Sequence, residues 1–271
     1  MIDLASLWIG DSLSPIEQAS AISFLRQGHK LYLYVLEDVK GVPPGVIIRD
    51  AREVLNTQKI IRHAKTGSPA LHSDLFRYAL LERTDQMWVD LDLIACKPLS
   101  FHDDYVFGYE SEHEVNGAVL KLPKNSPALV ELLKYKENTR GYPPMLKGLR
   151  KFRYLAKSFG QGLPIEKWPW GSIGPRALTH FLRSTGEISK AQELAAFYPV
   201  PFEEARRFIM PGEISPLDIS SDTYAVHLWG NSIRKILKSE FYEKIPADSY
   251  LGITIQECSN WCNYNIRMSM I

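Results

Sequence analysis

The sequence predicts an α/β fold built as one domain. Short apolar segments typical of strands alternate with longer amphipathic segments typical of helices. The 271 residues are 45% hydrophobic and 23% charged, a composition that allows a large buried core. No linker rich in Pro, Gly and Ser divides the chain, so we expect a single domain over residues 1–271. Its core is expected over about residues 1–125, and an elaborated half over about 126–271.

The first predicted elements are a strand, a helix and two further strands. The helix spans 14–28, where Ser14 can cap, Pro15 suits the first turn and Glu17 completes a capping box. The strands are predicted at residues 5–10, 30–37 and 45–50.

Two more Ser-Pro pairs, at Ser68 and Ser126, precede helical segments at 70–83 and 128–140. They are capping signals and not a sequence repeat. The remaining predicted strands are 87–95, 105–110, 117–123 and 223–230, and the remaining predicted helices are 145–159, 175–184 and 232–242.

The charge of the chain is nearly balanced. The 32 Lys and Arg residues against 31 Asp and Glu residues give a net charge of +1. We therefore expect no nucleic-acid partner, because a global basic field is missing. The N-terminus has no basic region followed by a long apolar run, and no 18 consecutive residues are apolar. A cytoplasmic location is the expectation.

The three cysteines agree with this expectation, because an odd number cannot form a complete disulfide framework. Cys258 and Cys262 lie four residues apart and could share a helical face. No second pair completes a zinc set, so plain thiols are favoured over structural zinc.

The segment MWVDLDLIACKPL, residues 87–99, places Asp90 and Asp92 inside an apolar run. On a strand both carboxylates project to one face, and the apolar residues project to the other. Burying one of them without a partner costs roughly 3 to 5 kcal/mol, so we expect a cation there. Mn²⁺ or Mg²⁺ suits carboxylates and substrate phosphates. The alternative is a solvent-exposed strand end at which the two aspartates only mark the edge.

The order of four motifs, LWIG, SDLFR, VDLD and HLWG, resembles the DXD glycosyltransferases that bear a glycosyltransferase sugar-binding region. This group includes yeast-type mannosyltransferases, α-1,4-galactosyltransferases, bacterial capsule transferases and the glucosylating domains of clostridial toxins. The resemblance implies a GT-A fold, a Rossmann-like sheet that binds a nucleotide sugar near the carboxyl ends of its strands. The alternating pattern of the sequence predicts the same general class.

The resemblance also implies site residues. Asp92 would ligate the metal, and Asp90 would contact the metal site, the ribose or the donor sugar. Asp74 and Arg77 would bind donor hydroxyls and phosphate. These two lie at i and i+3 of a predicted helix and can orient one another, although such pairs are also common as purely structural contacts.

Aromatic and polar residues complete the implied site. Trp8 would stack on the base, where stacking is worth ~1 to 3 kcal/mol, and otherwise is a core tryptophan. His227 would complete the metal shell or bind phosphate, and Trp229 belongs to a segment that closes over the diphosphate. Asn116 would lie near the reacting carbon, and otherwise Asn116-Gly117 is a turn.

One departure from the family concerns the residues before the D-x-D motif. Family members usually carry Gly-Gly there, whereas this chain has Asp85-Gln86. Aspartate tolerates a positive φ better than most residues, so we expect the tight turn to survive.

The resemblance implies retaining transfer of a hexose in polysaccharide biosynthesis, from a nucleotide diphosphate sugar to a saccharide or lipid-linked saccharide. A UDP-sugar is favoured over a GDP-sugar. No nucleophile is identified, and front-face attack guided by the donor phosphate is expected by analogy.

One alternative is a degenerate protein that binds the nucleotide sugar without turnover. The other is a haloacid-dehalogenase-like phosphatase, which is disfavoured because Asp103-Asp104 follow the strand too closely.

The segment MLKGLRKFRYLAKSF, residues 145–159, combines basic and apolar side chains at helical spacing. It fits a helix lying on an anionic membrane, and equally a helix packed on the domain with solvated lysines. The first interpretation would place the protein at the inner face of the membrane.

Overall fold

The computed structural model describes residues 1–156 and 158–268, and it confirms the predicted α/β class. Six strands form one sheet in the order β3-β2-β1-β4-β7-β6. β1 and β2 pair in parallel, with Leu4 opposite Leu31, whereas β6 and β7 are antiparallel. The strands are β1 (Leu4–Trp8), β2 (Leu31–Val35), β3 (Ile47–Asp50), β4 (Met87–Val89), β6 (Val106–Tyr109) and β7 (Val115–Lys121).

Contacts between residues divide the chain into two compact units, each drawn from distant parts of the sequence. The first unit comprises Met1–Arg49, Val89–His102 and Glu193–Ile271. The second comprises Asp50–Trp88 and Asp103–Gln192. The expected organisation as one domain stays a prediction.

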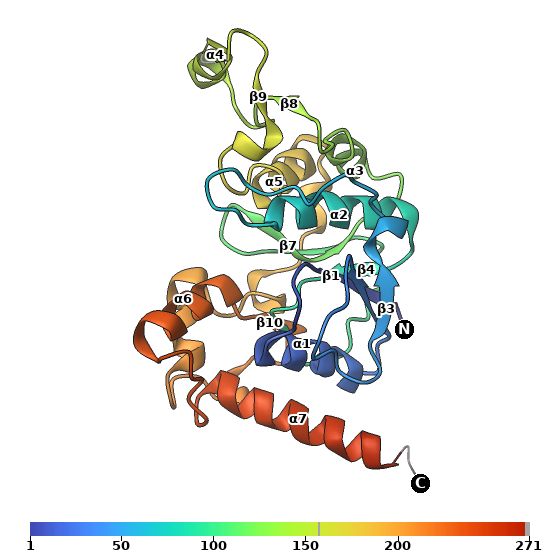
Figure 1. Ribbon diagram of the computed structural model, residues 1–271, viewed down its shortest axis with the longest axis vertical. Helices are drawn as coiled ribbons and strands as arrows, with labels where there is room; N and C mark the ends of the chain where they lie inside the picture. Colours follow the sequence, from blue (N-terminus) through green and yellow to red (C-terminus); the bar gives the residue numbers. More distant parts are fainter. Residues whose placement is uncertain (157, 269–271) are drawn as a thin grey trace. The chain divides into compact units, whose positions relative to one another are not determined.

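The first unit is built around helix α1 (Pro15–Arg26), which begins with the predicted capping box. The backbone N–H of Ile16 donates to Ser14 Oγ, and that of Ser14 donates to Glu17 Oε2 at 2.8 Å. α1 packs on strand β5 (Leu93–Ala95) and on the long helix α7 (Tyr250–Met268). Figure 1 shows α7 beside α1. β5 pairs in antiparallel fashion with β10 (Ala225–His227), and α6 (Gly230–Glu240) follows β10.

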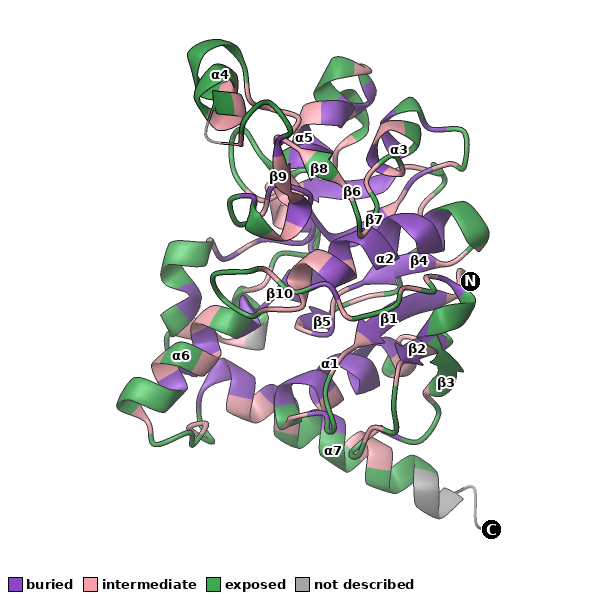
Figure 2. Cartoon of the chain, turned by 45° about the horizontal axis from the view of Figure 1, so that its top comes forward, coloured by how far each residue is buried: buried purple, intermediate pink, exposed green. Residues whose placement is uncertain are grey.

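The second unit is built around helix α2 (Ala70–Arg83). Helix α5 (Pro175–Ser184) packs on β7 and on α3 (Pro127–Leu132). The unit also holds the short pair β8 (Arg140–Gly141) and β9 (Leu163–Pro164), and helix α4 (Gly148–Ala156). Figure 2 shows α2 largely buried, whereas α4 has no buried residue. The 3₁₀ helices of the two units are Ala51–Glu53, Ile165–Lys167, Glu187–Lys190, Leu194–Ala196, Phe202–Ile209 and Pro216–Asp218.

The predicted strand over 87–95 is wrong as a continuous element. β4 ends at Val89 and β5 begins at Leu93, so Asp90 and Asp92 lie in the turn that joins them. The chain breaks here because β5 leaves the six-stranded sheet and pairs with β10 instead. The expected alternation of both aspartates along one strand face is therefore wrong.

Other element boundaries also differ from the prediction. α3 ends at Leu132 and not near residue 140, because the following residues form a turn in which Lys136 N donates to Thr139 Oγ1. Helix α7 was not predicted, since its apolar residues are interrupted by Gln, Glu and Asn.

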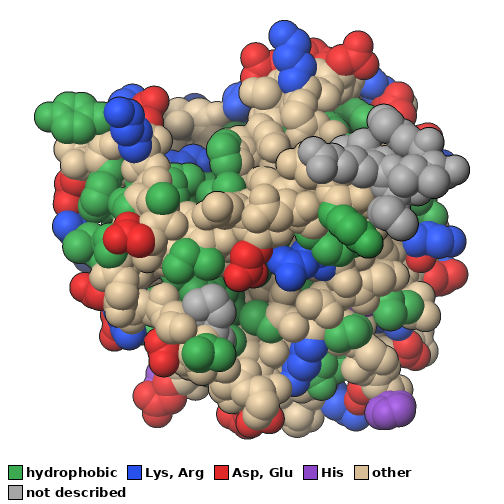
Figure 3. Space-filling model, turned by 90° about the horizontal axis from the view of Figure 1, so that it is seen from below, with side chains coloured by type: hydrophobic (Ala, Val, Ile, Leu, Met, Phe, Trp, Pro, Cys, Tyr) green, Lys and Arg blue, Asp and Glu red, His purple; other side chains and the backbone are tan. Residues whose placement is uncertain are grey.

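The surface carries both signs of charge. On the face drawn in Figure 3, Lys and Arg side chains are interspersed with Asp and Glu. This distribution matches the net charge of +1. Within the described residues, no helix combines the length and the hydropathy needed to cross a lipid bilayer.

Candidate functional site

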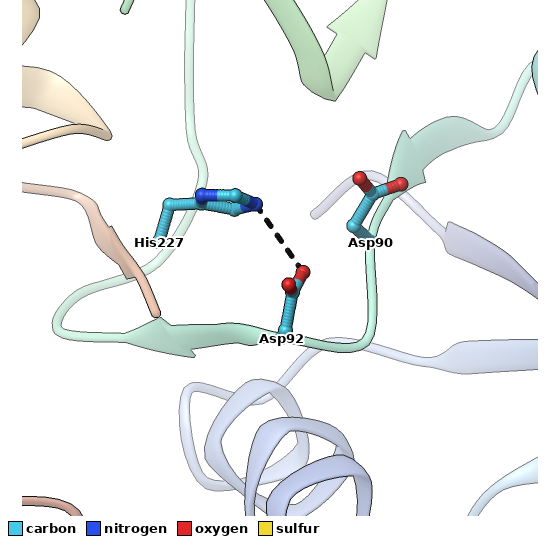
Figure 4. A group of neighbouring side chains, drawn as sticks. All are labelled: Asp90, Asp92 and His227. Carbon is cyan, nitrogen blue, oxygen red and sulfur yellow. Dashed lines mark ion pairs between the residues drawn. The ribbon is translucent and has the colours of Figure 1, made fainter. Parts of the chain in front are cut away.

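Asp90, Asp92 and His227 form a cluster in the first unit. Asp90 directly follows β4, Asp92 precedes β5, and His227 is the last residue of β10. The antiparallel register sets His227 opposite Leu93, next to Asp92. One ligand atom from each of the three side chains lies within 4.8 Å of the others, and Figure 4 shows the side chains turned toward one space.

Asp92 is held from two directions. Its Oδ1 lies 3.3 Å from Nε2 of His227, and its Oδ2 accepts a hydrogen bond of 2.8 Å from the backbone N–H of Gly230. The carbonyl of Asp92 also accepts from the N–H of Leu228. Both oxygens of the carboxylate are therefore aimed before any ligand binds.

The N–H of Gly230 matters because α6 begins at this residue and has no side-chain cap of its own. Asp92 thus supplies a carboxylate to the positive end of the helix dipole. A Cβ built on Gly230 would lie 3.0 Å from Asp92 Oδ2, so only glycine fits this contact without a shift. Trp229 enters the helix at φ 57°, a conformation that costs a non-glycine residue about 1 to 2 kcal/mol.

Electrostatics favour an ionised Asp92. Burial by itself would raise the pKa of the carboxyl. The nearby His227 and the hydrogen bonds from His227 and Gly230 outweigh burial, so the pKa of Asp92 lies below its ordinary value. A carboxylate that stays charged at neutral pH is suited to a cation.

The donor set fits a divalent transition ion. Two carboxylates supply hard oxygen ligands, and the imidazole of His227 supplies a nitrogen ligand. Imidazole suits Mn²⁺ better than Mg²⁺, which prefers oxygen ligands throughout. The residues present thus fit the expected metal.

His227 stands in an aromatic cluster that fixes its ring. Its ring centre lies 4.3 Å from that of Trp229 in an edge-on arrangement and 5.5 Å from that of Tyr198. Trp229 is itself buried and donates from Nε1 to the carbonyl of Val200. Trp229 thus orients the imidazole, and its expected place in a segment that closes over the diphosphate stays a prediction.

Trp8 ends β1 in the same unit and is partly exposed. Its Nε1 donates to the carbonyl of Ser12 at 3.1 Å, which fixes the indole beside Gly10. The expected role in base stacking stays a prediction.

Asp74 and Arg77 lie in the second unit, on α2, and pair as predicted at 3.6 Å. Both side chains are buried. Arg77 also donates to the carbonyl of Gly117 at 2.7 Å and stacks over the Trp88 ring. A Cβ on Gly117 would lie 2.8 Å from the guanidinium, so this glycine makes room for Arg77.

Asn116 belongs to strand β7, and the alternative interpretation of Asn116-Gly117 as a turn is wrong. Its Nδ2 donates to Glu110 Oε2 at 2.6 Å, and its Oδ1 accepts from the N–H of Ala118.

The segment before β4 needs no glycine. Positive φ angles at non-glycine residues of the described chain occur only at Phe159, Trp229, Tyr242 and Glu243. Neither Asp85 nor Gln86 has a positive φ, and the chain passes from α2 to β4 through a bend at Asp85. Thr84 Oγ1 accepts from the N–H of Gln86 and donates to the carbonyl of Leu80, which guides the chain from α2 into β4.

Comparisons with known proteins give structural likeness only. No family model and no curated protein matches the sequence. The fold is similar to a solved structure described as PaToxG glycosyltransferase, with 15% identity, a TM-score of 0.46, and coverage of 69% of this chain and 70% of that one. It is also similar to the WbbM bifunctional glycosyltransferase, with 11% identity, a TM-score of 0.34, and coverage of 95% of this chain and 51% of that one.

Proposed function

We propose that the chain is a GT-A glycosyltransferase that moves a hexose from a nucleotide diphosphate sugar to a hydroxyl of a glycan or glycolipid. The observation that carries the proposal is the convergence of Asp90, Asp92 and His227 at the carboxyl end of β4. Open α/β sheets bind ligands at the carboxyl ends of their strands. The ordered motifs of the sequence support the same function.

The metal-binding role falls to Asp90, Asp92 and His227. When bound, a divalent ion supplies electrostatic stabilisation to the departing diphosphate. The Gly230 N–H and the aromatic cluster around His227 hold two of the three ligands in place, so little reorganisation precedes binding. Retention of configuration and front-face attack follow from the family resemblance alone.

The remaining assignments concern the donor. We assign Trp8 to stacking on the base, uracil being favoured over guanine, and Asn116 to the neighbourhood of the reacting carbon. Asp74 is assigned to sugar hydroxyls because a carboxylate accepts hydrogen bonds from them, and Arg77 orients that carboxylate.

The test is Mn²⁺-dependent hydrolysis and transfer with UDP-, GDP- and CDP-sugars. Asp92→Asn should lower turnover at least 100-fold, because the variant loses the ligand charge and keeps the shape. Asp222→Asn is the matched control, since its carboxylate is exposed in the same unit. Full activity of Asp92→Asn would contradict the proposal.

Two outcomes would indicate the alternative functions. Binding of UDP and Mn²⁺ by calorimetry without turnover of any sugar would indicate a protein that binds without catalysing. A trapped aspartyl-phosphate and phosphomonoester hydrolysis would indicate a phosphatase.

We also propose that the protein contacts the inner face of the membrane through α4. Leu149 and Phe152 of α4 are both 68% exposed, and Phe159 after it is 96% exposed. The same segment carries the basic residues Lys147, Arg150, Lys151 and Arg153, whereas Lys157 lies outside the described residues. Figure 1 shows α4 at the end of its unit. Exposed apolar side chains on a basic segment match an anionic lipid surface.

Vesicle flotation tests the membrane contact. The chain should bind vesicles containing phosphatidylserine and not neutral vesicles, and Phe152→Ser should weaken binding about tenfold because the ring no longer enters the bilayer. Phe202→Ser removes another exposed phenylalanine, 54% exposed, and should leave vesicle binding unchanged. Equal binding to both kinds of vesicle would contradict the membrane contact.

A further inference from the structure

A pocket in the second unit combines aromatic walls with a buried carboxylate. It lies between the start of α2 and the loop that leads into α5, and its lining includes His63, Asp74, Trp168, Trp170 and Ser172. Every one of these residues belongs to the second unit. None of the aromatic residues was singled out by the family motifs.

The loop that carries the two tryptophans is firmly held. Trp168 is buried, and its Nε1 donates to the carbonyl of Leu163 at 2.9 Å. Ser172 Oγ donates to the carbonyl of Pro169, and Tyr78 of α2 donates to the carbonyl of Ile173. The shape of the pocket is therefore preformed.

Trp170 is the exposed wall of this pocket, at 47% exposure. Its indole meets the His63 ring edge-on, with ring centres 5.4 Å apart at 85°. The Thr66 N–H donates to His63 Nδ1, so the proton sits on Nε2, which donates to the carbonyl of Trp168. His63 thus holds the half-exposed indole in place.

Asp74 supplies the polar side of the pocket. A Cβ on Gly174 would lie 2.8 Å from one carboxylate oxygen, so a glycine is needed where the loop passes the acid. Arg77 pairs with Asp74, and the pair carries no net charge. A neutral ligand that donates hydrogen bonds is therefore a better match than a cation.

From these observations we propose that the pocket binds a pyranose ring, with its C–H face on Trp170 and its hydroxyls donating to Asp74. A pyranose has both properties, an apolar face and a rim of hydroxyl donors, whereas the pocket offers an apolar wall and an acceptor. The choice of a saccharide as the ligand rests on the proposed function. Trp170 is then a specificity-determining residue, because it contacts the ring and not the nucleotide.

The experiment is saturation-transfer NMR on the full chain without metal. The probes are the methyl glycosides of glucose, galactose, mannose and N-acetylglucosamine. At least one glycoside should bind, Trp170→Ala should weaken it about tenfold, and Trp170→Phe should restore most of the loss because a ring remains. Tyr264→Ala, which removes an aromatic residue 63% exposed on α7, is the control and should change nothing.

A second set of measurements, with Mn²⁺, distinguishes a donor sugar from an acceptor sugar. Its probes are UDP-glucose, UDP-galactose, GDP-mannose and the bare nucleotides. Loss of affinity at Trp170→Ala for a nucleotide sugar but not for its bare nucleotide assigns the pocket to the donor, whereas an effect on free glycosides alone assigns it to the acceptor. Both outcomes support saccharide binding in the pocket, and the second would move Asp74 from the donor, as proposed above, to the acceptor.

The proposal fails if Trp170→Ala changes the affinity for neither the glycosides nor the nucleotide sugars. It also fails if the variant changes the binding of choline but of no saccharide. Glycoside binding without any transfer activity would support the saccharide pocket and overturn the proposed function. Failure of the pocket proposal and failure of the proposed function are therefore distinguishable.

Discussion

At the scale of single residues, the structure explains why Asp92 stands in an apolar segment. Asp92 caps a helix and pairs with His227, so it has a structural use besides its expected metal-binding use. The two uses are compatible, because the Gly230 N–H occupies Oδ2 whereas Oδ1 faces the imidazole. A carboxylate with a fixed position is a better metal ligand than a mobile one.

Gly230→Ala tests this positioning. The added Cβ would press on Asp92 Oδ2, so the carboxylate must shift by a few tenths of an ångström. We expect Mn²⁺ affinity to fall about tenfold by calorimetry, in the range found when metal-ligand supports are altered. Asn231→Ala, one residue later in the same helix, should leave the affinity unchanged. Equal affinities of both variants would contradict the role of the glycine.

Arg77 gives a second prediction at this scale. Arg77→Met removes the donor to Gly117 and the cation that pairs with the buried Asp74 carboxylate. The free energy of unfolding should fall by about 3 to 5 kcal/mol in urea denaturation. The double variant Asp74→Asn, Arg77→Met should be less destabilised than Arg77→Met alone, because no charge is then stranded. A double variant at least as unstable would count against the ion pair as the cause.

At the scale of elements, a buried carboxylate organises the start of α3. Glu187 Oε1 accepts hydrogen bonds from Tyr105 and Ser126, and Oε2 accepts from the Ala128 N–H and from Thr185. Burial by itself would raise the pKa of Glu187. The four hydrogen bonds outweigh burial, so the pKa of Glu187 lies below its ordinary value. Burial first, and then the hydrogen bond to Glu187, raises the pKa of Tyr105 to about 12.

The lowered pKa of Glu187 makes the free energy of unfolding depend on pH. A lowered carboxyl pKa stabilises the folded state above the unfolded pKa of about 4.3, and this stability is lost as the pH falls through the folded pKa. Glu187→Gln should cost about 1 to 3 kcal/mol at pH 7 and much less below pH ~4. Urea denaturation at both pH values measures this. A cost independent of pH would contradict an ionised Glu187.

Among the elements, those set by local signals could be predicted from the sequence, and those set by distant contacts could not. The Ser14–Glu17 capping box is a local signal, and α1 begins where that signal places it. The break between β4 and β5 depends on β10, more than 120 residues away, so no local pattern could reveal it. His227 and Gly230 both belong to the HLWG motif, whereas Trp170 and His63 act only through tertiary contacts. The WPWG segment, residues 168–171, is the local sequence signal for Trp170.

At the scale of the whole molecule, the two units carry different parts of the proposed chemistry. The first holds the cluster of Asp90, Asp92 and His227, and the second holds the Asp74 pair and the aromatic pocket. The balanced charge of the chain offers no general attraction for polyanions, so recognition of the proposed nucleotide sugar would depend on these local groups.

The central claim is that Asp90, Asp92 and His227 bind one divalent ion, and isothermal titration with Mn²⁺ tests it most directly. The wild-type chain should bind one Mn²⁺ more tightly than Mg²⁺, and Asp92→Asn and His227→Ala should each weaken binding at least tenfold, while Asp222→Asn binds like the wild type. Wild-type affinity and stoichiometry in both Asp92→Asn and His227→Ala would contradict the claim.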